Sequence, residues 1–392
     1  MHAPMWLFYT EYILRITDMN TIINFIKKET IFFISIILAI ISMFFVHPDI
    51  SYLDYIDWNT LLLLFSLMAV MAGYKRLGVF RLIGVKLLSG THSTRQLMLI
   101  LTMLPFFFSM LITNDVALIT FVPFAIIVLK LAAKEELIIT VVVLQTLAAN
   151  LGSMLTPMGN PQNLYLYAAS GLSPIEFLKL MLPYTLIAAI AIILCCLLHK
   201  NRPIDTIDTT ALSASESIPK TSVILYGMAF FLCLLSVSDV LHPGITAFVI
   251  LVFLIIYDRA CIMEIDYTLL GTFIGFFVFI GNMQRIPEFR QLIRNIIEGN
   301  EVIISVISSQ VISNVPTALL LSGFTDRYSL LIIGTNLGGL GTLIASMASL
   351  ISYKQIAREY PDERISYFIK FTIANILMLG LLLLFFFARN MS

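Results

Sequence analysis

Charged side chains are scarce in this sequence. Asp, Glu, Lys and Arg make up 12% of its 392 residues, whereas soluble domains contain roughly 25%. Hydrophobic residues make up 59% and form continuous runs such as residues 30–41, a pattern typical of spanning helices and not of the alternating strands of a β-barrel. The formal net charge is zero, so nothing favours a nucleic-acid partner. The composition therefore predicts an all-α polytopic membrane protein in a lipid bilayer.

Residues for redox, metal or nucleophilic chemistry are also few. The four cysteines have no CxxC spacing, and the five histidines lie at the ends of apolar runs or in loops. Ser313 is the only plausible nucleophile, and no histidine falls at its depth to activate it. An HExxH motif is absent as well. We therefore expect no enzymatic activity, and no cofactor beyond a coupling ion, which would be sodium or a proton.

The stretch from 150 to 164 is the most informative part of the sequence. It lies between apolar runs, yet it contains two prolines, two glycines and six amide or hydroxyl side chains. Unpaired backbone groups cost several kcal/mol in hydrocarbon, so a broken helix persists only where protein or a water-filled cavity surrounds it. Such breaks are the usual binding sites of secondary transporters. The stretch therefore predicts a broken helix over 137–170 that helps to form a transport site.

Polar residues interrupt three further apolar runs. These interruptions are residues 113–115 in the run 97–131, residues 313–317 in the run 301–325, and residues 336–342 in the run 329–350. The first run fits two full spans, with Asp115 in an outer loop, or a hairpin that enters and leaves on one face. Basic residues at both of its ends allow either, but the short break favours the hairpin.

The two halves of the chain repeat one another. Asn150-Leu151-Gly152-x-x-x-Thr156 recurs as Asn336-Leu337-Gly338-x-x-x-Thr342, and Asn114 corresponds to Asn314. Two weaker matches follow the same order, so chance is a poor explanation. Counting crossings from a cytoplasmic N-terminus gives about nine full spans, with the two repeats antiparallel and the C-terminus periplasmic.

These patterns predict the following organisation. The parts are an interfacial N-terminal segment over 1–29, a first transmembrane repeat over 30–198 with its hairpin at 97–131 and broken helix at 137–170, a cytoplasmic linker over 199–220, and a second repeat over 221–392 with its hairpin at 301–325 and broken helix at 329–350. Residues 74–95 and 284–300 are charged but amphipathic, which predicts helices lying in the plane of the membrane.

The motifs at 113–115, 156–164 and 313–317 resemble those of the ion transporter superfamily. That superfamily includes arsenite permeases, sodium/proton antiporters and citrate and dicarboxylate permeases, and the likeness is strongest to a bacterial inner-membrane branch of YbiR-like anion transporters. The resemblance implies an elevator-type homodimer, with a scaffold part and a moving transport part that holds both hairpins and both broken helices. The dicarboxylate branch has Ser-Asn-Thr at both hairpin tips, whereas the Asn114-Asp115 tip here is more similar to the arsenite and sodium/proton branches.

Asp115 is the sharpest candidate for coupling. An ionisable side chain inside a membrane usually has a functional reason. The alternative is that Asp115 only caps the helix that begins at the tip. The asparagines at the tips are alternatively structural turn residues, and the glycines serve packing alone. We expect a sodium site near Asn114, Asp115 and Asn160. The predicted substrate- and ion-binding residues are Thr113, Asn114, Asp115, Asn150, Gly152, Ser153, Thr156, Gly159, Asn160, Ser313, Asn314, Thr317, Asn336, Gly338, Thr342 and Ser346.

The sequence thus favours a secondary active transporter in the bacterial inner membrane. It would move a small anion or an oxyacid such as arsenite, coupled to protons or sodium. A sodium/proton antiporter and a passive anion channel are the alternatives, and two inverted hairpins favour alternating access over a static pore. The expected partners are a small ionic substrate, the lipid bilayer and a second copy of the chain.

Overall fold

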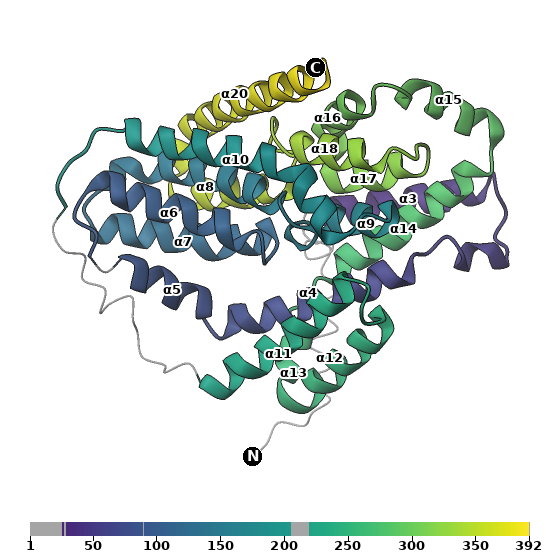
Figure 1. Cartoon of the computed structure of the whole chain (residues 1–392), viewed down its shortest axis with the longest axis horizontal. Coiled ribbons are helices and arrows are strands. Elements are labelled where there is room, and N and C mark those ends of the chain that lie inside the picture. Colours follow the sequence, from purple (N-terminus) through teal and green to yellow (C-terminus); the bar gives the residue numbers. More distant parts are fainter. Residues whose placement is uncertain (1–25, 27–28, 89, 205–218, 392) are drawn as a thin grey trace. The chain divides into compact units, whose positions relative to one another are not determined.

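The computed structural model describes residue 26 and the ranges 29–88, 90–204 and 219–391 (Figure 1). The predicted interfacial segment over 1–29 and most of the linker over 199–220 therefore lie outside the described residues. Within these ranges the chain is helical, and its one β-type contact is an isolated bridge between Ser93 and Pro203. The predicted all-α class is confirmed.

The helices group into two compact units, and neither unit is one continuous stretch of chain. The first combines Met1–Asp57 with Asp266–Arg290, and the second combines Trp58–Ile265 with Gln291–Ser392. Both units thus draw on both halves of the sequence. Both interrupted runs that we interpreted as hairpins, and both broken helices, fall in the second unit.

The first unit is built on one pair of helices, α3 (Thr30–Met43) and α14 (Tyr267–Gln284). Gly275 allows the close approach, because a Cβ there would lie 2.6 Å from Ser35 Oγ and 2.9 Å from the Ser35 carbonyl carbon. The buried Asn282 donates to Ser42 Oγ and to Tyr52 Oη, each at 2.8 Å. Small residues and the buried Nδ2 of Asn282 therefore hold this pair together, as is common between membrane helices.

In the second unit, α8 (Ile138–Ser153) is the central helix of the N-terminal half, and almost all of its side chains are buried. Helices α6, α7 and α10 pack against it (Figure 1). The other elements from this half and from the middle of the chain are α4 (Trp58–Arg76), α5 (Val79–Leu88), α6 (Thr94–Phe108), α7 (Asn114–Leu131), η2 (Glu135–Leu137), η3 (Pro157–Gly159), α9 (Pro161–Ser170), α10 (Pro174–Leu198), α11 (Lys220–Val237), α12 (Pro243–Tyr257) and α13 (Arg259–Ile262).

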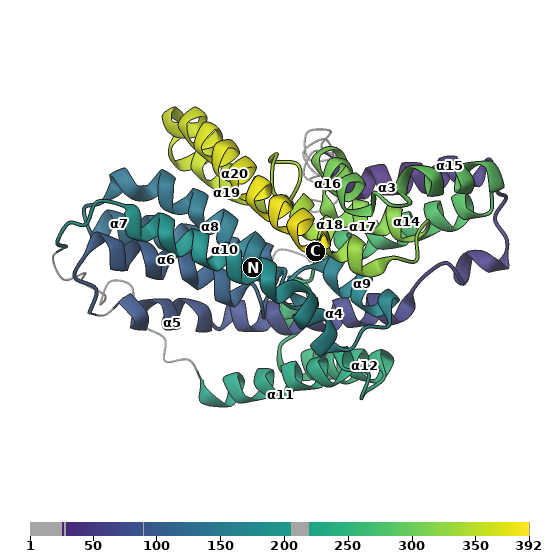
Figure 2. The same cartoon turned by 45° about the horizontal axis from the view of Figure 1, so that its top comes forward.

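The C-terminal part of the second unit begins after α15 (Pro287–Ile297), which crosses the boundary between the units. Its elements are α16 (Glu301–Ile312), α17 (Asn314–Ser322), α18 (Tyr328–Gly338), α19 (Met347–Glu359), η4 (Pro361–Glu363) and α20 (Arg364–Met391). Helices α19 and α20 pack against each other (Figure 2). Helix α19 also packs against α7 and α8, so the two halves of the sequence interleave in this unit.

The helices are interrupted at the predicted residues. The turn 109–113 separates α6 from α7, and Ser313 alone separates α16 from α17. Helix α8 ends at Ser153 and α18 ends at Gly338. The two segments interpreted as lying in the membrane plane contain the short helices α5 and α15. Local sequence chemistry thus placed each of these boundaries to within a few residues.

Seven described helical segments are long and apolar enough to cross a membrane. Nine were expected, but α3, α12 and α18 have 14, 15 and 11 residues, or about 16–23 Å at 1.5 Å per residue, against a hydrocarbon core about 30 Å thick. Helix α7, expected as one arm of a hairpin, has 18 residues and is among the seven. The multi-pass class itself is confirmed by the seven.

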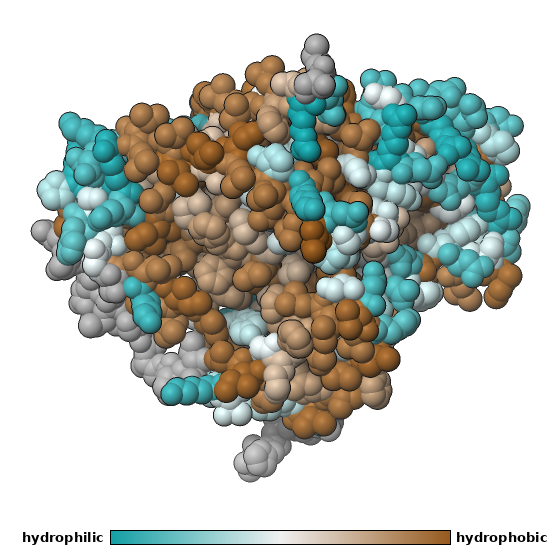
Figure 3. All heavy atoms as spheres, viewed as in Figure 1, coloured by the Kyte–Doolittle hydropathy of each residue, from teal (hydrophilic) through white to brown (hydrophobic). Residues whose placement is uncertain are grey.

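Exposed apolar side chains identify the lipid-facing surface. On α10 they recur every fourth residue, at Leu182, Leu186, Ile190 and Leu194, each more than 40% exposed. Side chains four apart share one face of a helix. Apolar atoms cover much of the face shown in Figure 3. A soluble monomer rarely exposes such a continuous apolar surface.

The packing of α3 on α14 gives a first prediction. Replacing Gly275 by valine should lower the midpoint of thermal unfolding in detergent by several degrees, because overpacking against the Ser35 backbone costs about 1–3 kcal/mol. Gly380→Val in α20 is the matched control, since a Cβ at Gly380 meets nothing within 4 Å. Equal midpoints for the two variants would contradict this account of the pair.

Candidate functional site

The tip between α6 and α7 presents a buried asparagine at a helix N-terminus. Asn114 is the first residue of α7 and 4% exposed. The N-cap is Thr113, whose hydroxyl accepts from the Val116 N–H at 3.5 Å. Asp115 lies in the first turn, and its own N–H donates to Asn114 Oδ1 at 2.9 Å. The N-cap position is thus occupied by Thr113 and not by Asp115, which lies in the first turn of α7.

Asn150 is the centre of the buried polar contacts. Its Oδ1 accepts from Asn114 Nδ2 at 2.8 Å and from Ser346 Oγ at 3.0 Å, and its Nδ2 donates to Ser349 Oγ at 3.2 Å. Ser346 is the N-cap residue of α19, and Ser349 lies in the first turn of that helix. One amide at the end of α8 thus joins α7 from the first half to α19 from the second.

A second series of hydrogen bonds continues from Asn150 along the broken helix. Ser153 Oγ donates to the Asn150 carbonyl at 2.9 Å and accepts from Asn160 Nδ2 at 2.6 Å. Asn163 Nδ2 donates to the Ser153 carbonyl at 3.3 Å, while Asn163 Oδ1 accepts from Asn336 Nδ2 at 2.6 Å. The series therefore reaches α18 in the second half. We call this set the amide cluster, and its members are Asn114, Asn150, Ser153, Asn160, Asn163, Asn336, Ser346 and Ser349.

The cluster connects the two halves in a reciprocal way. Asn150 bonds to Ser349, and Asn336 bonds to Asn163. The offset of 186 that relates Asn150 to Asn336 also relates Asn163 to Ser349. Each broken helix thus contributes an asparagine from before its break to a polar residue after the break of the other.

Ser313, between α16 and α17, has an unusual backbone conformation. Its φ is +73°, a region that a non-glycine residue enters at a cost of order 1–3 kcal/mol. Its hydroxyl donates to the Ala345 carbonyl at 3.4 Å, and the Asn314 N–H donates to the same carbonyl at 3.0 Å. Ala345 directly precedes Ser346, so the N-terminus of α17 lies beside that of α19.

Three helix N-termini consequently lie close together. Those of α7 and α19 are both bonded to Asn150, and that of α17 is bonded to the residue before Ser346. A helix N-terminus presents free N–H groups and the equivalent of about half a positive charge. None of the cluster's members is basic, so the positive potential within the cluster comes from these helix ends.

Matching glycines bring each broken helix against its hairpin. A Cβ on Gly152 would lie 2.8 Å from Ser109 Oγ, and a Cβ on Gly338 would lie 2.5 Å from Ser309 Oγ. Gly159 approaches the Ser153 carbonyl in the same way, at 2.1 Å. A packing role for these three glycines therefore follows from the contacts.

The remaining predicted residues lie around the cluster. Thr156 Oγ1 donates to the Met110 carbonyl, and Thr342 Oγ1 donates to the Gln310 carbonyl at 3.2 Å. Thr317 is fully buried, and its hydroxyl has no hydrogen-bond partner among the described residues. Thr342, in contrast, is exposed.

Sequence reasoning missed Asn163, Ser349 and Gln310. The offset of 186 pairs Asn163 with Ser349, so the repeat contained a signal for both. Gln310 matches Met110 at the hairpin offset of 200 and has no such signal. The buried Gln162 was also missed, and neither of its amide atoms has a hydrogen-bond partner within the described ranges.

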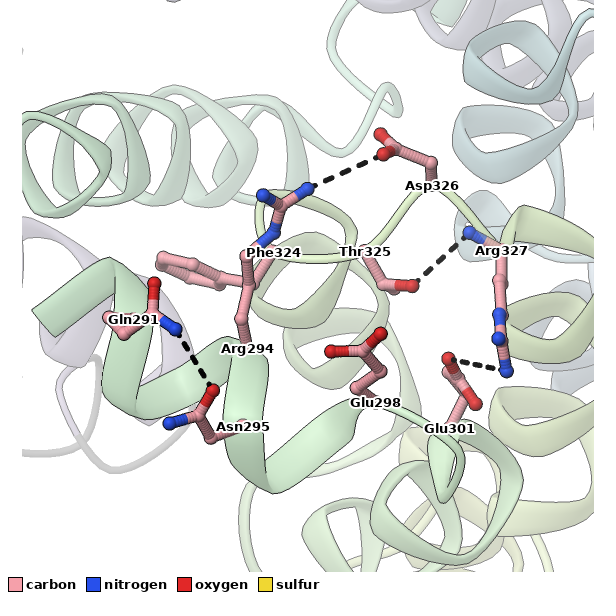
Figure 4. A pocket seen from close by; sticks show the side chains of 9 residues that line it. All are labelled: Gln291, Arg294, Asn295, Glu298, Glu301, Phe324, Thr325, Asp326 and Arg327. Atoms are coloured by element: carbon pink, nitrogen blue, oxygen red, sulfur yellow. Dashed lines mark hydrogen bonds and ion pairs between the residues drawn. The ribbon is translucent and has the colours of Figure 1, made fainter. Parts of the chain in front are cut away.

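A separate pocket of about 330 Å³ lies between the end of α15 and the starts of α16 and α18 (Figure 4). Arg294 Nη2 lies 3.4 Å from Asp326 Oδ2, and Arg327 Nη1 lies 3.6 Å from Oε1 of the buried Glu301. The pocket contains none of the predicted site residues. Its opposite charges are largely paired with one another, so it differs in character from the amide cluster.

The expected sodium site has no carboxylate-rich centre. No group of three His, Cys, Asp or Glu side chains that suits a metal occurs in the described part of the chain. Sodium would instead need the oxygens of amides, hydroxyls and unwound backbone, which are the ligands that hard cations accept. Asn114 Nδ2 donates to Asn150 Oδ1, and Asn160 Nδ2 donates to Ser153 Oγ, so both amide nitrogens are used within the cluster.

Comparisons with known proteins identify relatives over most of the chain. The chain is 32% identical to the uncharacterised transporter MJ0456 of Methanocaldococcus jannaschii over 82% of this chain and 87% of that one. It is 28% identical to the inner membrane protein YbiR of Escherichia coli over 76% of this chain and 80% of that one. A shorter match, 38% identical over 33% of this chain and 26% of the relative, is to the silicon efflux transporter LSI3 of Oryza sativa subsp. japonica.

A protein-family model described as a citrate transporter matches residues 21–326, which is more than half of the sequence. MJ0456, which is matched over most of its length, is named as a transporter, and the described helices are those of a multi-pass membrane protein. The chain therefore belongs to the citrate transporter family and is a membrane transporter, not an enzyme.

Proposed function

We propose that this protein is a secondary active transporter that moves a small anion or an oxyacid across the bacterial inner membrane, coupled to sodium or protons. The observation that carries the proposal is the meeting of three helix N-termini at the amide cluster. The partial positive charge of these helix ends favours a negatively charged or strongly dipolar substrate. Asparagine and serine side chains supply both donors and acceptors, which suits a substrate rich in oxygen.

The comparisons support the class of substrate without naming it. The family is named for citrate, and one relative is named for silicon efflux. YbiR is named as an inner membrane protein, which supports that location here. We place the N-terminus in the cytoplasm and the C-terminus in the periplasm, as the distribution of Lys and Arg favours.

Coupling is assigned to the first half of the chain. Asp115 lies beside Asn114 and is the only carboxylate at either hairpin tip. A carboxylate there can hold sodium as an anion or carry a proton as a titrating acid. The same observation favours one alternative function, sodium/proton antiport, in which no anion moves.

Alternating access is supported by the reciprocal bonds of the amide cluster. Matched contacts between the two halves are those expected of an inverted repeat, and sites at the interface of such repeats are typical of secondary transporters. The second unit contains both hairpins and both broken helices, which fits a moving transport part. We further propose that the transporter is an elevator-type homodimer.

Flux into proteoliposomes tests coupling. With citrate or arsenite as substrate, uptake by the wild type should rise under an inward sodium or proton gradient, and Asp115→Asn should abolish that stimulation because the carboxylate is lost. Asp239→Asn is the matched control, since Asp239 is exposed and distant in sequence from both hairpins. Unchanged stimulation in Asp115→Asn would refute the coupling role.

The same vesicles separate the alternatives. An antiporter would exchange sodium for protons with no anion present, visible as a change in internal pH. A channel would pass the anion equally well with either gradient dissipated.

The amide cluster gives a second prediction. Asn150→Leu should lower substrate flux at least about tenfold, because it removes three bonds to two other helices, α7 and α19, and leaves buried donors unpaired. Asn375→Leu is the control, since Asn375 is also buried but donates only to the Phe371 carbonyl of its own helix. Flux in Asn150→Leu that equals flux in Asn375→Leu would show that the cluster does not serve transport.

A further inference from the structure

Gln310 and Met110 occupy matching positions in the two halves. Both precede their tip asparagine by four residues, and the backbone carbonyl of each accepts from a matching threonine, Thr342 or Thr156. The main-chain contacts at the two positions are therefore alike. The side chains differ, because one is an amide and the other a thioether.

The Gln310 side chain bonds directly to the unwound segment after α18. Its Nε2 lies 3.0 Å from the Gly338 carbonyl oxygen and 2.9 Å from the Leu340 carbonyl oxygen. Its Oε1 accepts from the Thr342 N–H at 2.9 Å. One half-buried amide thus satisfies three backbone groups that the end of the helix leaves without helical partners.

Gly341 makes room for this contact. Its φ is +111°, and a Cβ there would lie 2.3 Å from Gln310 Oε1. The residue at the matching position in the first half is Leu155, which carries a side chain where Gly341 has none. The sequence of the second half is therefore built to admit the Gln310 amide, and that of the first half is not.

In the first half a different side chain bonds the unwound segment, because Asn163 Nδ2 donates to the Ser153 and Thr156 carbonyls at 3.3 Å each. The groups that match the Leu340 carbonyl and the Thr342 N–H are the Met154 carbonyl and the Thr156 N–H, and within the described ranges no side chain bonds to either. Carbonyl oxygens of unwound helices are the usual ligands of a coupling cation. An N–H donor already placed on such an oxygen competes with a cation for it.

We infer that Gln310 takes the place of a cation in the second half, so that the coupling cation binds only at the unwound segment 152–159 of the first. The inference rests on the proposed function and adds to it that the matched pair of segments binds one cation and not two. Gln310 is a positioning residue that holds the segment 338–342 fixed.

Hydrogen exchange of the full-length protein in detergent, followed by mass spectrometry, tests the inference without measuring transport. The wild type is compared in sodium chloride and in N-methylglucamine chloride, and at pH 6 and pH 8 with exchange corrected for pH. Sodium or the lower pH should slow exchange over 152–159 and leave exchange over 338–345 unchanged. Gln310→Met should raise exchange over 338–345 at least about tenfold. Gly341→Ala should do the same, because its Cβ displaces the amide.

The reciprocal variant completes the test. Met110→Gln combined with Leu155→Gly installs the amide and its space in the first half, so exchange over 152–159 should be slow in every buffer and the cation dependence of flux should disappear. Leu155→Gly alone is the control. Equal protection of both segments by a cation, no response over 152–159 to either cation, or unchanged exchange in Gln310→Met would each overturn the inference. Failure of the proposed function would give a different result, in which the wild type shows no flux but these exchange patterns are all observed.

Discussion

The arrangement of the second unit depends on one constraint, which is that backbone N–H and C=O groups cannot stay unpaired where water is excluded. Four helix interruptions create such groups, after Phe108 and Ser153 and around Ser313 and Gly338. Side-chain amides supply much of the missing bonding. Asn163 bonds the Ser153 and Thr156 carbonyls, and Gln310 bonds those of Gly338 and Leu340.

The same constraint explains why the two halves are interleaved. An interrupted helix cannot satisfy its broken end with its own residues, so each break borrows from elements distant in sequence. Asn150 reaches α19, and Asn336 reaches α9. Because these bonds are buried, losing one partner would leave the other unpaired at a cost of about 1–3 kcal/mol. Folding of the amide cluster therefore requires both halves at once.

Binding chemistry follows from the remaining groups. Once amides satisfy the broken ends, the N-termini of α7, α17 and α19 still bring the positive ends of three helix dipoles into one neighbourhood. A site of this kind attracts a negative or dipolar substrate without a basic side chain. It also differs between the halves, since Asp115 belongs to the first and Gln310 to the second.

The sequence alone determined the all-α membrane class and the places where helices break. These features follow from local chemistry, since apolar runs require helices and clustered Pro, Gly and Asn end them. The offset of 186 also carried the pairing of Asn163 with Ser349, although single-residue reasoning passed over it.

Only the tertiary structure decided which groups satisfy those breaks. Thr113 and not Asp115 caps α7, and Asn150 is the residue that joins α7 to α19. Gln310 is a single glutamine in an ordinary apolar run, and its role depends on the position of a segment about thirty residues away that only folding brings beside it. Hydrogen bonds between distant segments depend on packing in three dimensions, and that packing is not written in the local pattern of residues.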